Sequence, residues 1–166
     1  MVTVYLSLGS NIDREKNLSA GLDALVETFG DLRMSQVYES EAVGFDGDNF
    51  YNLVAAIESD LPVGELALRL RNIEDANGRV RSGPKFSART LDIDILTYDD
   101  LTGEVDGVKL PRGEILKNAF VLLPLSELAP DLVHPVQGKS YQQLWEEYDQ
   151  ASQKLWAVEF NWPGDA

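Results

Sequence analysis

The amino-acid sequence predicts an α+β fold, in which an antiparallel sheet of the ferredoxin-like β-α-β-β-α-β type carries packed helices and C-terminal additions. Short segments alternate apolar with polar or small residues, as strands do, whereas two longer segments repeat leucines at helical spacing. Turn residues rich in Gly, Asp and Asn separate these segments. Their order over residues 2–97 is that of the split β-α-β motif.

The first half of the chain supplies the first strand, helix and strand pair. The predicted strands are residues 2–8, 32–39 and 50–59, and the predicted helices are residues 13–29 and 62–76. Pro62 is suited to the first position of its helix, with Asp60 nearby as a candidate cap. Residues 40–49 have the Gly and Asp content of a loop, and Asn77 with Gly78 ends the second helix.

The second half completes the sheet and adds further elements. Residues 91–97 predict a strand, and an Asp-Asp-Leu-Thr-Gly turn leads to a partner strand near residues 105–110. Two helices over 122–128 and 140–149 and a terminal strand over 155–160 follow. We find no internal repeat and no interdomain linker, so residues 1–166 are expected to form a single domain.

Composition narrows the class of protein. A hydrophobic content of 44% with 25% charged residues is typical of a globular domain with a real core. The N-terminal residues read as a strand and not as a signal peptide, and no apolar run is long enough to span a bilayer. We therefore expect a cytoplasmic protein. The absence of cysteine excludes disulfides, thiolate catalysis and Cys-zinc sites.

The net charge of −14 argues against binding to nucleic acid or to an anionic membrane, because such binding needs many Lys and Arg side chains over a broad surface. An RNA-binding ferredoxin-like domain is disfavoured for the same reason, and the chain also lacks an aromatic RNP-type strand motif. We expect a small-molecule partner and a monomer.

Six cations nevertheless lie within 21 residues, which indicates an anion site inside an acidic molecule. They are Arg69, Arg71, Arg79, Arg81, Lys85 and Arg89. Arg binds phosphate in a bidentate manner and keeps its charge. The alternative is an exposed basic loop paired with acids elsewhere.

Two carboxylates directly follow these cations. In a strand, Asp92 and Asp94 point to one face, while Leu91, Ile93 and Ile95 point into the core. Paired carboxylates with nearby polyphosphate suit Mg²⁺, which prefers oxygen ligands and keeps substrate phosphates in its shell. Taken alone, Asp-x-Asp also fits a solvated strand face or the metal site of a nucleotide-sugar glycosyltransferase.

Several ordered motifs make the assignment more specific. They are Leu-Gly-Ser-Asn at 8–11, Phe-Tyr-Asn at 50–52, Ile-Glu at 73–74, Gly-Arg-Val-Arg at 78–81, Arg-Thr-Leu-Asp-Ile-Asp-Ile at 89–95 and Phe-Val-Leu-Leu-Pro-Leu-Ser-Glu-Leu-Ala-Pro at 120–130. In these motifs the chain resembles 6-hydroxymethyl-7,8-dihydropterin pyrophosphokinases, enzymes of folate biosynthesis, along nearly its whole length.

The resemblance implies transfer of a pyrophosphoryl group from ATP to the hydroxymethyl oxygen of the pterin, with two Mg²⁺ ions bound by Asp92 and Asp94. It implies that Arg79 and Arg89 hold the triphosphate and stabilise developing charge, while Arg81 and Phe86 lie in a loop that closes over the site. Further nucleotide contacts are expected from Arg71, Glu74 and Arg112.

For the pterin, the resemblance implies that Phe50 and Phe120 sandwich the ring and that Asn52 bonds its polar edge, together with backbone groups of Ser40, Ala42 and Val43. Without the family, Phe50 and Phe120 read as core residues and Asn52 as a turn residue. The lone His134 and the three tryptophans read as structural or surface residues.

The chain also departs from the family pattern. Arg112 stands where the family has His, Asn118 stands where it has Arg, and Glu41 lies in a pterin loop that commonly contains Thr-Pro. Arg112 can compensate for the charge lost at Asn118, or the two changes can weaken ATP binding. The alternative function is therefore a divergent relative that binds nucleotide or pterin without efficient transfer.

Overall fold

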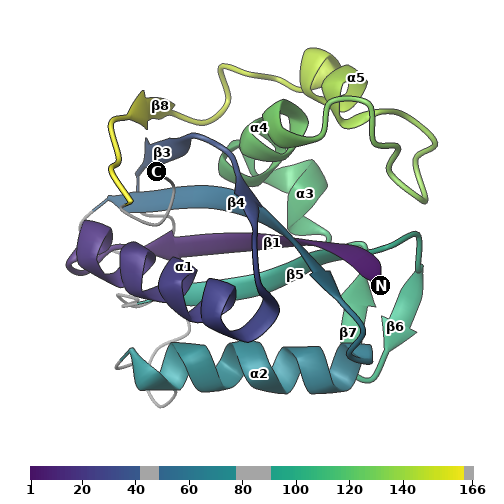
Figure 1. The fold of residues 1–166 in the computed structure, drawn as a ribbon. Helices are drawn as coiled ribbons and strands as arrows, with labels where there is room; N and C mark the ends of the chain where they lie inside the picture. The colour runs from purple at the N-terminus through teal and green to yellow at the C-terminus, as the bar shows by residue number, and fades with distance from the viewer. Residues whose placement is uncertain (42–48, 78–90, 163–166) are drawn as a thin grey trace.

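The computed structural model describes residues 1–41, 49–77 and 91–162 (Figure 1). Its centre is a six-stranded sheet with the order β5-β1-β4-β3-β8, in which β2 also pairs with β4 and every pairing is antiparallel. The strands are β1 Val2–Ser10, β2 Arg33–Met34, β3 Val37–Ser40, β4 Phe50–Ser59, β5 Asp92–Tyr98 and β8 Leu155–Val158. A separate hairpin joins β6 Gly103–Val105 to β7 Val108–Leu110.

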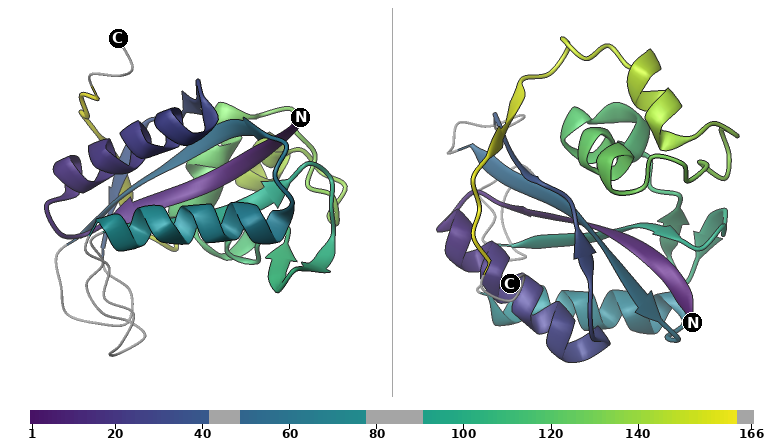
Figure 2. Two further views of the ribbon diagram at one scale, coloured as in Figure 1. Left: turned by 60° about the horizontal axis from the view of Figure 1, so that its bottom comes forward. Right: turned by 45° about the horizontal axis from the view of Figure 1, so that its top comes forward.

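Helices cover both faces of the sheet. The long helices α1 Arg14–Phe29 and α2 Val63–Ala76 lie side by side on one face, and α3 Glu114–Lys117, α4 Ala119–Leu128 and α5 Tyr141–Glu147 lie on the other (Figures 1 and 2). No helix in the described part of the chain is both long and apolar enough to cross a membrane.

The face under α1 and α2 holds the larger core. Leu18, Leu22 and Leu25 of α1 recur at helical spacing and are fully buried, as the sequence predicts. Leu66 and Leu70 do the same for α2, packing on alternate residues of β1 and β5. This core fixes which side of each central strand faces away from α1 and α2.

The opposite face holds a second core of Tyr5, Val54, Leu96, Leu122 and Leu125, among others. Helix α4 begins at Ala119, three residues before the predicted start at 122, and the short helix α3 was not predicted at all. The early start of α4 depends on a distant partner, because the Ala119 amide donates to Gln153 Oε1 at 2.8 Å. Such a partner leaves no local signal.

Several other boundaries differ from the prediction. Pro62 precedes α2 as its N-cap, and Asp60 instead pairs with the N-terminal amine at 3.1 Å. The predicted strand 32–39 is divided into β2 and β3, and the region 105–110 forms a hairpin with itself instead of pairing with β5. Most of the predicted loop 40–49 lies outside the described residues.

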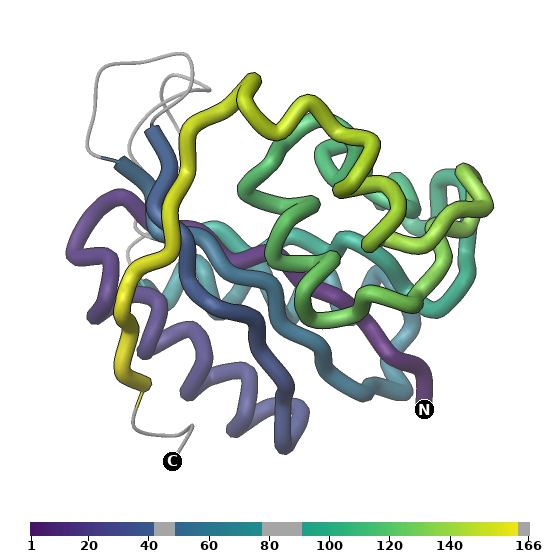
Figure 3. Tube along the Cα trace, turned by 90° about the horizontal axis from the view of Figure 1, so that it is seen from above, coloured from purple at the N-terminus to yellow at the C-terminus, as the bar shows by residue number. Residues whose placement is uncertain are grey.

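The C-terminal segment returns to the sheet edge. Strand β8 pairs with β3, and Figure 3 shows this yellow segment running beside β3 after leaving α5. Beyond β8, Trp162 is buried and its Nε1 donates to Asp23 Oδ1 of α1 at 2.7 Å. The end of the described chain is therefore held to α1, on the face that α1 and α2 cover.

Candidate active site

The candidate site begins with the register of three neighbouring strands. In β1, Gly9 lies opposite Asn52 of β4 and Asp92 of β5, and one step inward Ser7 lies opposite Asp94. Residues directly across a sheet share a face, so Asn52, Gly9 and Asp92 form one row across the three strands. Ser7 and Asp94 form the next row on the same face.

Alternation assigns these rows to the face opposite α1 and α2. Leu91, Ile93 and Ile95 are buried in the core under those two helices, as predicted. Asp94 points the other way and keeps 42% of its side chain exposed. Asp92 is also only partly buried. The prediction that both carboxylates share one accessible face is confirmed.

A pocket of about 200 Å³ lies over this end of the sheet. Its lining comes from β1, β4 and β5 below and from α3, α4 and their flanking residues at the side. The lining residues are Ser7, Gly9, Phe50, Asn52, Asp92, Asp94, Leu96, Arg112, Glu114, Asn118, Phe120 and Val121. The pocket thus brings together six residues that the sequence predicted for the site, Phe50, Asn52, Asp92, Asp94, Arg112 and Phe120. It also contains Asn118, which departs from the family pattern.

Glu74 supports the aspartate pair from beneath. This α2 residue is only 7% exposed, and its Oε2 accepts a hydrogen bond from the Ile93 amide at 2.8 Å. Ile93 lies between Asp92 and Asp94, so this hydrogen bond from its amide to Glu74 holds the strand backbone between the two aspartates. Glu74 does not line the pocket, so its contact here is with the strand backbone.

Asn52 is held in place inside the pocket wall. It is 4% exposed, and its Nδ2 donates to Ser40 Oγ of β3 at 2.8 Å. A Cβ atom added to Gly9 would lie 3.0 Å from Asn52 Oδ1, which is closer than such contacts normally come. The absence of a side chain at Gly9 therefore leaves room for the Asn52 amide in its present position.

Arg112 brings the one basic side chain among the described lining residues. Its Nε lies 2.6 Å from Glu114 Oε2, and its Nη2 lies 3.7 Å from Asp94 Oδ1. The Arg112 amide donates to the Leu96 carbonyl at 2.8 Å, which anchors this residue to β5. With 37% of its side chain exposed, Arg112 can exchange these carboxylates for an anionic ligand.

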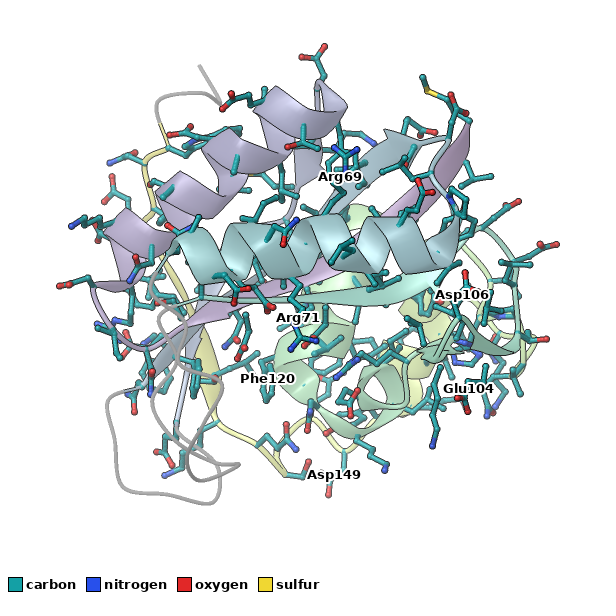
Figure 4. The ribbon with its side chains drawn as sticks, turned by 90° about the horizontal axis from the view of Figure 1, so that it is seen from below. Arg69, Arg71, Glu104, Asp106, Phe120 and Asp149 are labelled. Atoms are coloured by element: carbon teal, nitrogen blue, oxygen red, sulfur yellow. The ribbon has the colours of Figure 1, made fainter. Side chains whose placement is uncertain are left out.

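Two aromatic side chains reach the pocket from different elements. Phe50 begins β4 and Phe120 lies in the first turn of α4, and both are only partly buried. Figure 4 shows Phe120 on the same side of α2 as Arg71, whereas Arg69 lies on the opposite side of that helix. Phe50 and Phe120 line one cavity, so they are not ordinary core residues.

A larger hollow of about 760 Å³ lies near the start of α1 and is a weaker candidate. Its Arg14 is already paired with Glu39 at 3.3 Å and lies 4.0 Å from the centre of the Tyr51 ring. Glu39 and Tyr51 alternate with Ser40, Phe50 and Asn52 along their strands, so they belong to the other face.

The donor set over the sheet suits a hard divalent cation. Three acidic side chains and one basic side chain line the pocket among the described residues. The described part of the chain contains no group of three or more His, Cys, Asp or Glu residues arranged to hold a metal by themselves. The carboxylate pair of Asp92 and Asp94 fits Mg²⁺, which usually takes one or two carboxylates and completes its shell with phosphate and water.

Comparison with known protein families shows which family this chain belongs to. The family model described as 7,8-dihydro-6-hydroxymethylpterin-pyrophosphokinase (HPPK) matches residues 5–130, which include every described pocket residue. The chain belongs to the HPPK family. It thereby belongs to a family of pyrophosphokinases, as the sequence motifs indicate.

Individual relatives agree with the HPPK family model. A 2-amino-4-hydroxy-6-hydroxymethyldihydropteridine pyrophosphokinase of Aquifex aeolicus is 37% identical over 141 residues, covering 84% of this chain and 88% of that protein. The enzyme of the same name from Pseudomonas aeruginosa is 38% identical and covers 80% and 83%. The Folic acid synthesis protein FOL1 of Dictyostelium discoideum is 35% identical over 80% of this chain, which spans only 20% of that longer protein.

Solved structures show the same fold. A Plasmodium falciparum HPPK-DHPS crystal structure with pteroate aligns with 89% of this chain at a TM-score of 0.67 and 16% sequence identity, and the match spans 42% of that chain. At this identity the likeness concerns the fold alone. It establishes a mixed α/β structure with an antiparallel sheet and packed helices, as in HPPK domains.

Some HPPK-like residues predicted from the sequence lie outside the described residues. They are Ala42, Val43, Arg79, Arg81, Phe86 and Arg89. Arg71 is described but is exposed on α2 and does not line the pocket. The roles predicted for these residues stay predictions.

Sequence reasoning assigned no site role to five residues that line the pocket: Ser7, Gly9, Leu96, Glu114 and Val121. Ser7 and Gly9 could have been found from the sequence, because strand alternation in β1 places them on the face away from the buried Leu6 and Leu8. Glu114 carried none, because its position depends on the unpredicted helix α3 and on the ion pair with Arg112.

Proposed function

We propose that this protein transfers a pyrophosphoryl group from ATP to the hydroxymethyl oxygen of 6-hydroxymethyl-7,8-dihydropterin and releases AMP. The observation that carries the proposal is one pocket in which the aspartate pair and Arg112 lie beside Phe50, Phe120 and Asn52. The first group suits a polyphosphate and the second suits a flat heterocycle with a polar edge. The relatives from Aquifex and Pseudomonas carry the corresponding name.

In this reaction the pterin hydroxyl oxygen bonds to the β-phosphorus of ATP. The bond from that phosphorus to the oxygen bridging the α- and β-phosphates breaks, and AMP departs with the bridging oxygen and its electron pair. The hydroxyl proton passes to solvent or to a phosphate oxygen. Catalysis of this kind needs positioning and neutralisation of charge, with no covalent enzyme intermediate.

Asp92 and Asp94 would hold two Mg²⁺ ions against the polyphosphate, and bound magnesium supplies neutralisation of the developing phosphoryl charge. The chain's own contribution is to fix both carboxylates on one sheet face. Glu74 holds the strand by accepting a hydrogen bond from the Ile93 amide. Burial of the Ile93 and Ile95 side chains keeps that face of β5 toward the core, so the aspartates stay on the other face.

We further propose that Arg112 binds the nucleotide. The Arg112 guanidinium now lies 2.6 Å from the Glu114 carboxylate and 3.7 Å from the Asp94 carboxylate. A phosphate group of the nucleotide is also an anion, so it can replace these carboxylates as the partner of Arg112. Arg79, Arg89, Arg81, Phe86, Arg71 and Glu74 complete the proposed nucleotide side by family resemblance.

The pterin would lie between Phe50 and Phe120 with its polar edge toward Asn52. The Asn52 Nδ2 is engaged by Ser40, so its Oδ1 is the atom oriented to accept from a ring N–H. Backbone groups of Ser40, Ala42 and Val43 would complete the edge. Aromatic sandwiching favours a flat ring over an extended sugar.

The finer architecture is also a proposal. We propose a ferredoxin-like core of β1, α1, β3, β4, α2 and β5, supported by the strand order β5-β1-β4-β3 and by antiparallel pairing throughout. A single domain over residues 1–166, a monomeric state and a cytoplasmic location accompany it.

The test of function is formation of AMP by purified protein given ATP, Mg²⁺ and 6-hydroxymethyl-7,8-dihydropterin. We expect one AMP for each pterin diphosphate, and no AMP when either the pterin or magnesium is omitted. ADP as the product, or no AMP, would refute pyrophosphoryl transfer. Ligand binding without AMP would instead support the divergent binding module.

Arg112 has its own test in the same assay. Arg112→Gln should raise the KM for ATP about tenfold, because a charge-assisted bond to phosphate is lost, while the KM for the pterin changes less than about twofold. Lys109→Gln, on the hairpin strand β7, is the matched charge control. An unchanged KM for ATP would exclude Arg112 from the nucleotide site.

A further inference from the structure

The segment after α5 lies outside the residues matched by the HPPK family model, yet it contacts the pocket wall. Tyr148 Oη donates to the Lys117 carbonyl at 2.7 Å, and Gln153 Nε2 donates to the same oxygen at 3.1 Å. Gln153 Oε1 also accepts from the Ala119 amide at 2.8 Å. One glutamine therefore bonds the peptide groups on both sides of Asn118.

These bonds act at a helix end that lacks its own cap. Asn118 is the N-cap of α4 but makes no side-chain cap hydrogen bond. The Ala119 amide is one of the amides that a helix start leaves without an internal partner, and Gln153 supplies the acceptor instead. Because Asn118 and Phe120 both line the pocket, Gln153 sets the backbone from which they project.

The same segment is joined to the opposite wall. In β8, Leu155 lies opposite Ser40 and Trp156 lies opposite Glu39 of β3. Ser40 in turn accepts the hydrogen bond from Asn52. A groove of about 460 Å³ runs between the two attachments, with Ser40 and Glu41 on one side and Ala119 and Phe120 on the other. Figure 3 shows the chain passing from α5 to the edge of β3.

We infer that Gln153 is a positioning residue for the pterin wall, which it holds by bonding Lys117 and Ala119 so that Phe120 faces Phe50 and Asn52 at a fixed separation. The inference rests on the proposed function, because only a flat ligand between those walls makes their separation matter. A role confined to stability would affect nucleotide and pterin alike. A positioning role weakens the pterin selectively.

The decisive variants are Gln153→Met and Gln153→Glu. Methionine has a similar length but removes both hydrogen bonds, so we expect the Kd for the pterin, measured with a non-hydrolysable ATP analogue present, to rise about tenfold while the Kd for the analogue stays within about twofold. Glutamate keeps the acceptor for the Ala119 amide but has no donor for the Lys117 carbonyl, so its Kd for the pterin should lie between those of the wild type and Gln153→Met. Gln150→Met is the matched control, because Gln150 is exposed and its Nε2 donates to the Trp145 carbonyl at 3.0 Å.

Hydrogen exchange of the ligand-free protein separates this inference from the proposed function. Exchange of the Ala119 amide should accelerate in Gln153→Met and not in Gln150→Met. Faster exchange with an unchanged pterin Kd would overturn the positioning role, as would equal losses of pterin and nucleotide affinity. A wild-type protein that binds the pterin but makes no AMP would refute only the transfer reaction, whereas one that binds no pterin would refute both.

Discussion

The two faces of β1 and β5 carry different kinds of side chain along the same stretch of strand. On the face toward α1 and α2, Leu6, Leu8, Ile93 and Ile95 are buried almost completely. On the other face, Ser7, Gly9, Asp92 and Asp94 line a pocket. Successive residues of a strand point to opposite faces, so the difference between the two faces comes from this alternation and from the helices that cover each face.

The difference teaches where rigidity and reactivity come from in this molecule. The α1 and α2 face supplies burial, which stabilises the fold by about 25 cal/mol for each Å² of apolar surface removed from water. The pocket face keeps charged groups near solvent, where they can exchange partners. Glu74 links the two, since it is buried with the core but bonds the peptide between the aspartates.

The largest effect is expected at Asp94. Asp94→Ala should reduce the rate of AMP formation by about 10³-fold or more, because a lost metal ligand removes several kcal/mol of charge stabilisation. The free energy of unfolding should change little, since Asp94 lies on the accessible face. Asp100→Ala, in the exposed turn after β5, is the control.

The neighbouring Ile95 offers the reverse outcome. Ile95→Val should lower the free energy of unfolding by about 0.5–1.5 kcal/mol while activity per folded molecule stays near that of the wild type. Near-normal turnover in Asp94→Ala, or a loss of activity in Ile95→Val as large as that in Asp94→Ala, would break the division between the two faces.

Glu74 tests the link between the faces. Glu74→Leu leaves the Ile93 amide buried without its acceptor, so the free energy of unfolding should fall by about 1–3 kcal/mol. The rate of AMP formation should fall as well, because the backbone between the aspartates is no longer held. Glu74→Gln keeps an acceptor oxygen and should retain most of both. If Glu74→Leu lowered stability alone, the carboxylate pair would not depend on support from α2.

Gly9 tests how closely the pocket face is packed. Gly9→Ala places a methyl group 3.0 Å from the present position of Asn52 Oδ1, so the amide must move. We expect the KM for the pterin to rise about fivefold with a smaller change for ATP, since a hydrogen bond to the ligand weakens by less than its full value. Gly113→Ala is the matched control, because a Cβ there meets nothing within 4 Å. Equal effects of the two substitutions would contradict the account.

The smallest effect concerns a region away from both strand faces. Burial lowers the pKa of His134, whose Nδ1 accepts from the Val136 and Gln137 amides at 3.1 and 3.0 Å. The neutral ring is thus favoured in the fold, so its contribution to stability is complete above the unfolded pKa of about 6.5 and declines as the pH falls through the lower folded pKa.

His134→Asn keeps an acceptor but cannot titrate. Chemical denaturation between pH 8 and pH 5 should show the wild type losing stability relative to this variant as the pH falls below about 6.5. Parallel pH curves would show that His134 does not contribute to the pH dependence. Activity at constant pH should be the same in both proteins, since His134 is not in the pocket.

The sequence predicted the α1 and α2 face nearly in full, because alternation in β1 and β5 and leucine spacing in α1 are local patterns. It also placed Asp92 and Asp94 on one face for the same reason. It did not predict α3 or the early start of α4, because those depend on Arg112 pairing with Glu114 and on Gln153 bonding Ala119 across 34 residues. Family resemblance alone selected Phe50, Asn52 and Phe120, whose individual patterns match ordinary core or turn residues.

The most direct measurement is a crystal structure with Mg²⁺, a non-hydrolysable ATP analogue and the pterin. The account predicts magnesium density about 2.0–2.1 Å from carboxylate oxygens of both Asp92 and Asp94, with the pterin ring between Phe50 and Phe120. Magnesium bound elsewhere, with both carboxylates turned away from the nucleotide, would contradict the assignment of this sheet face as the active site.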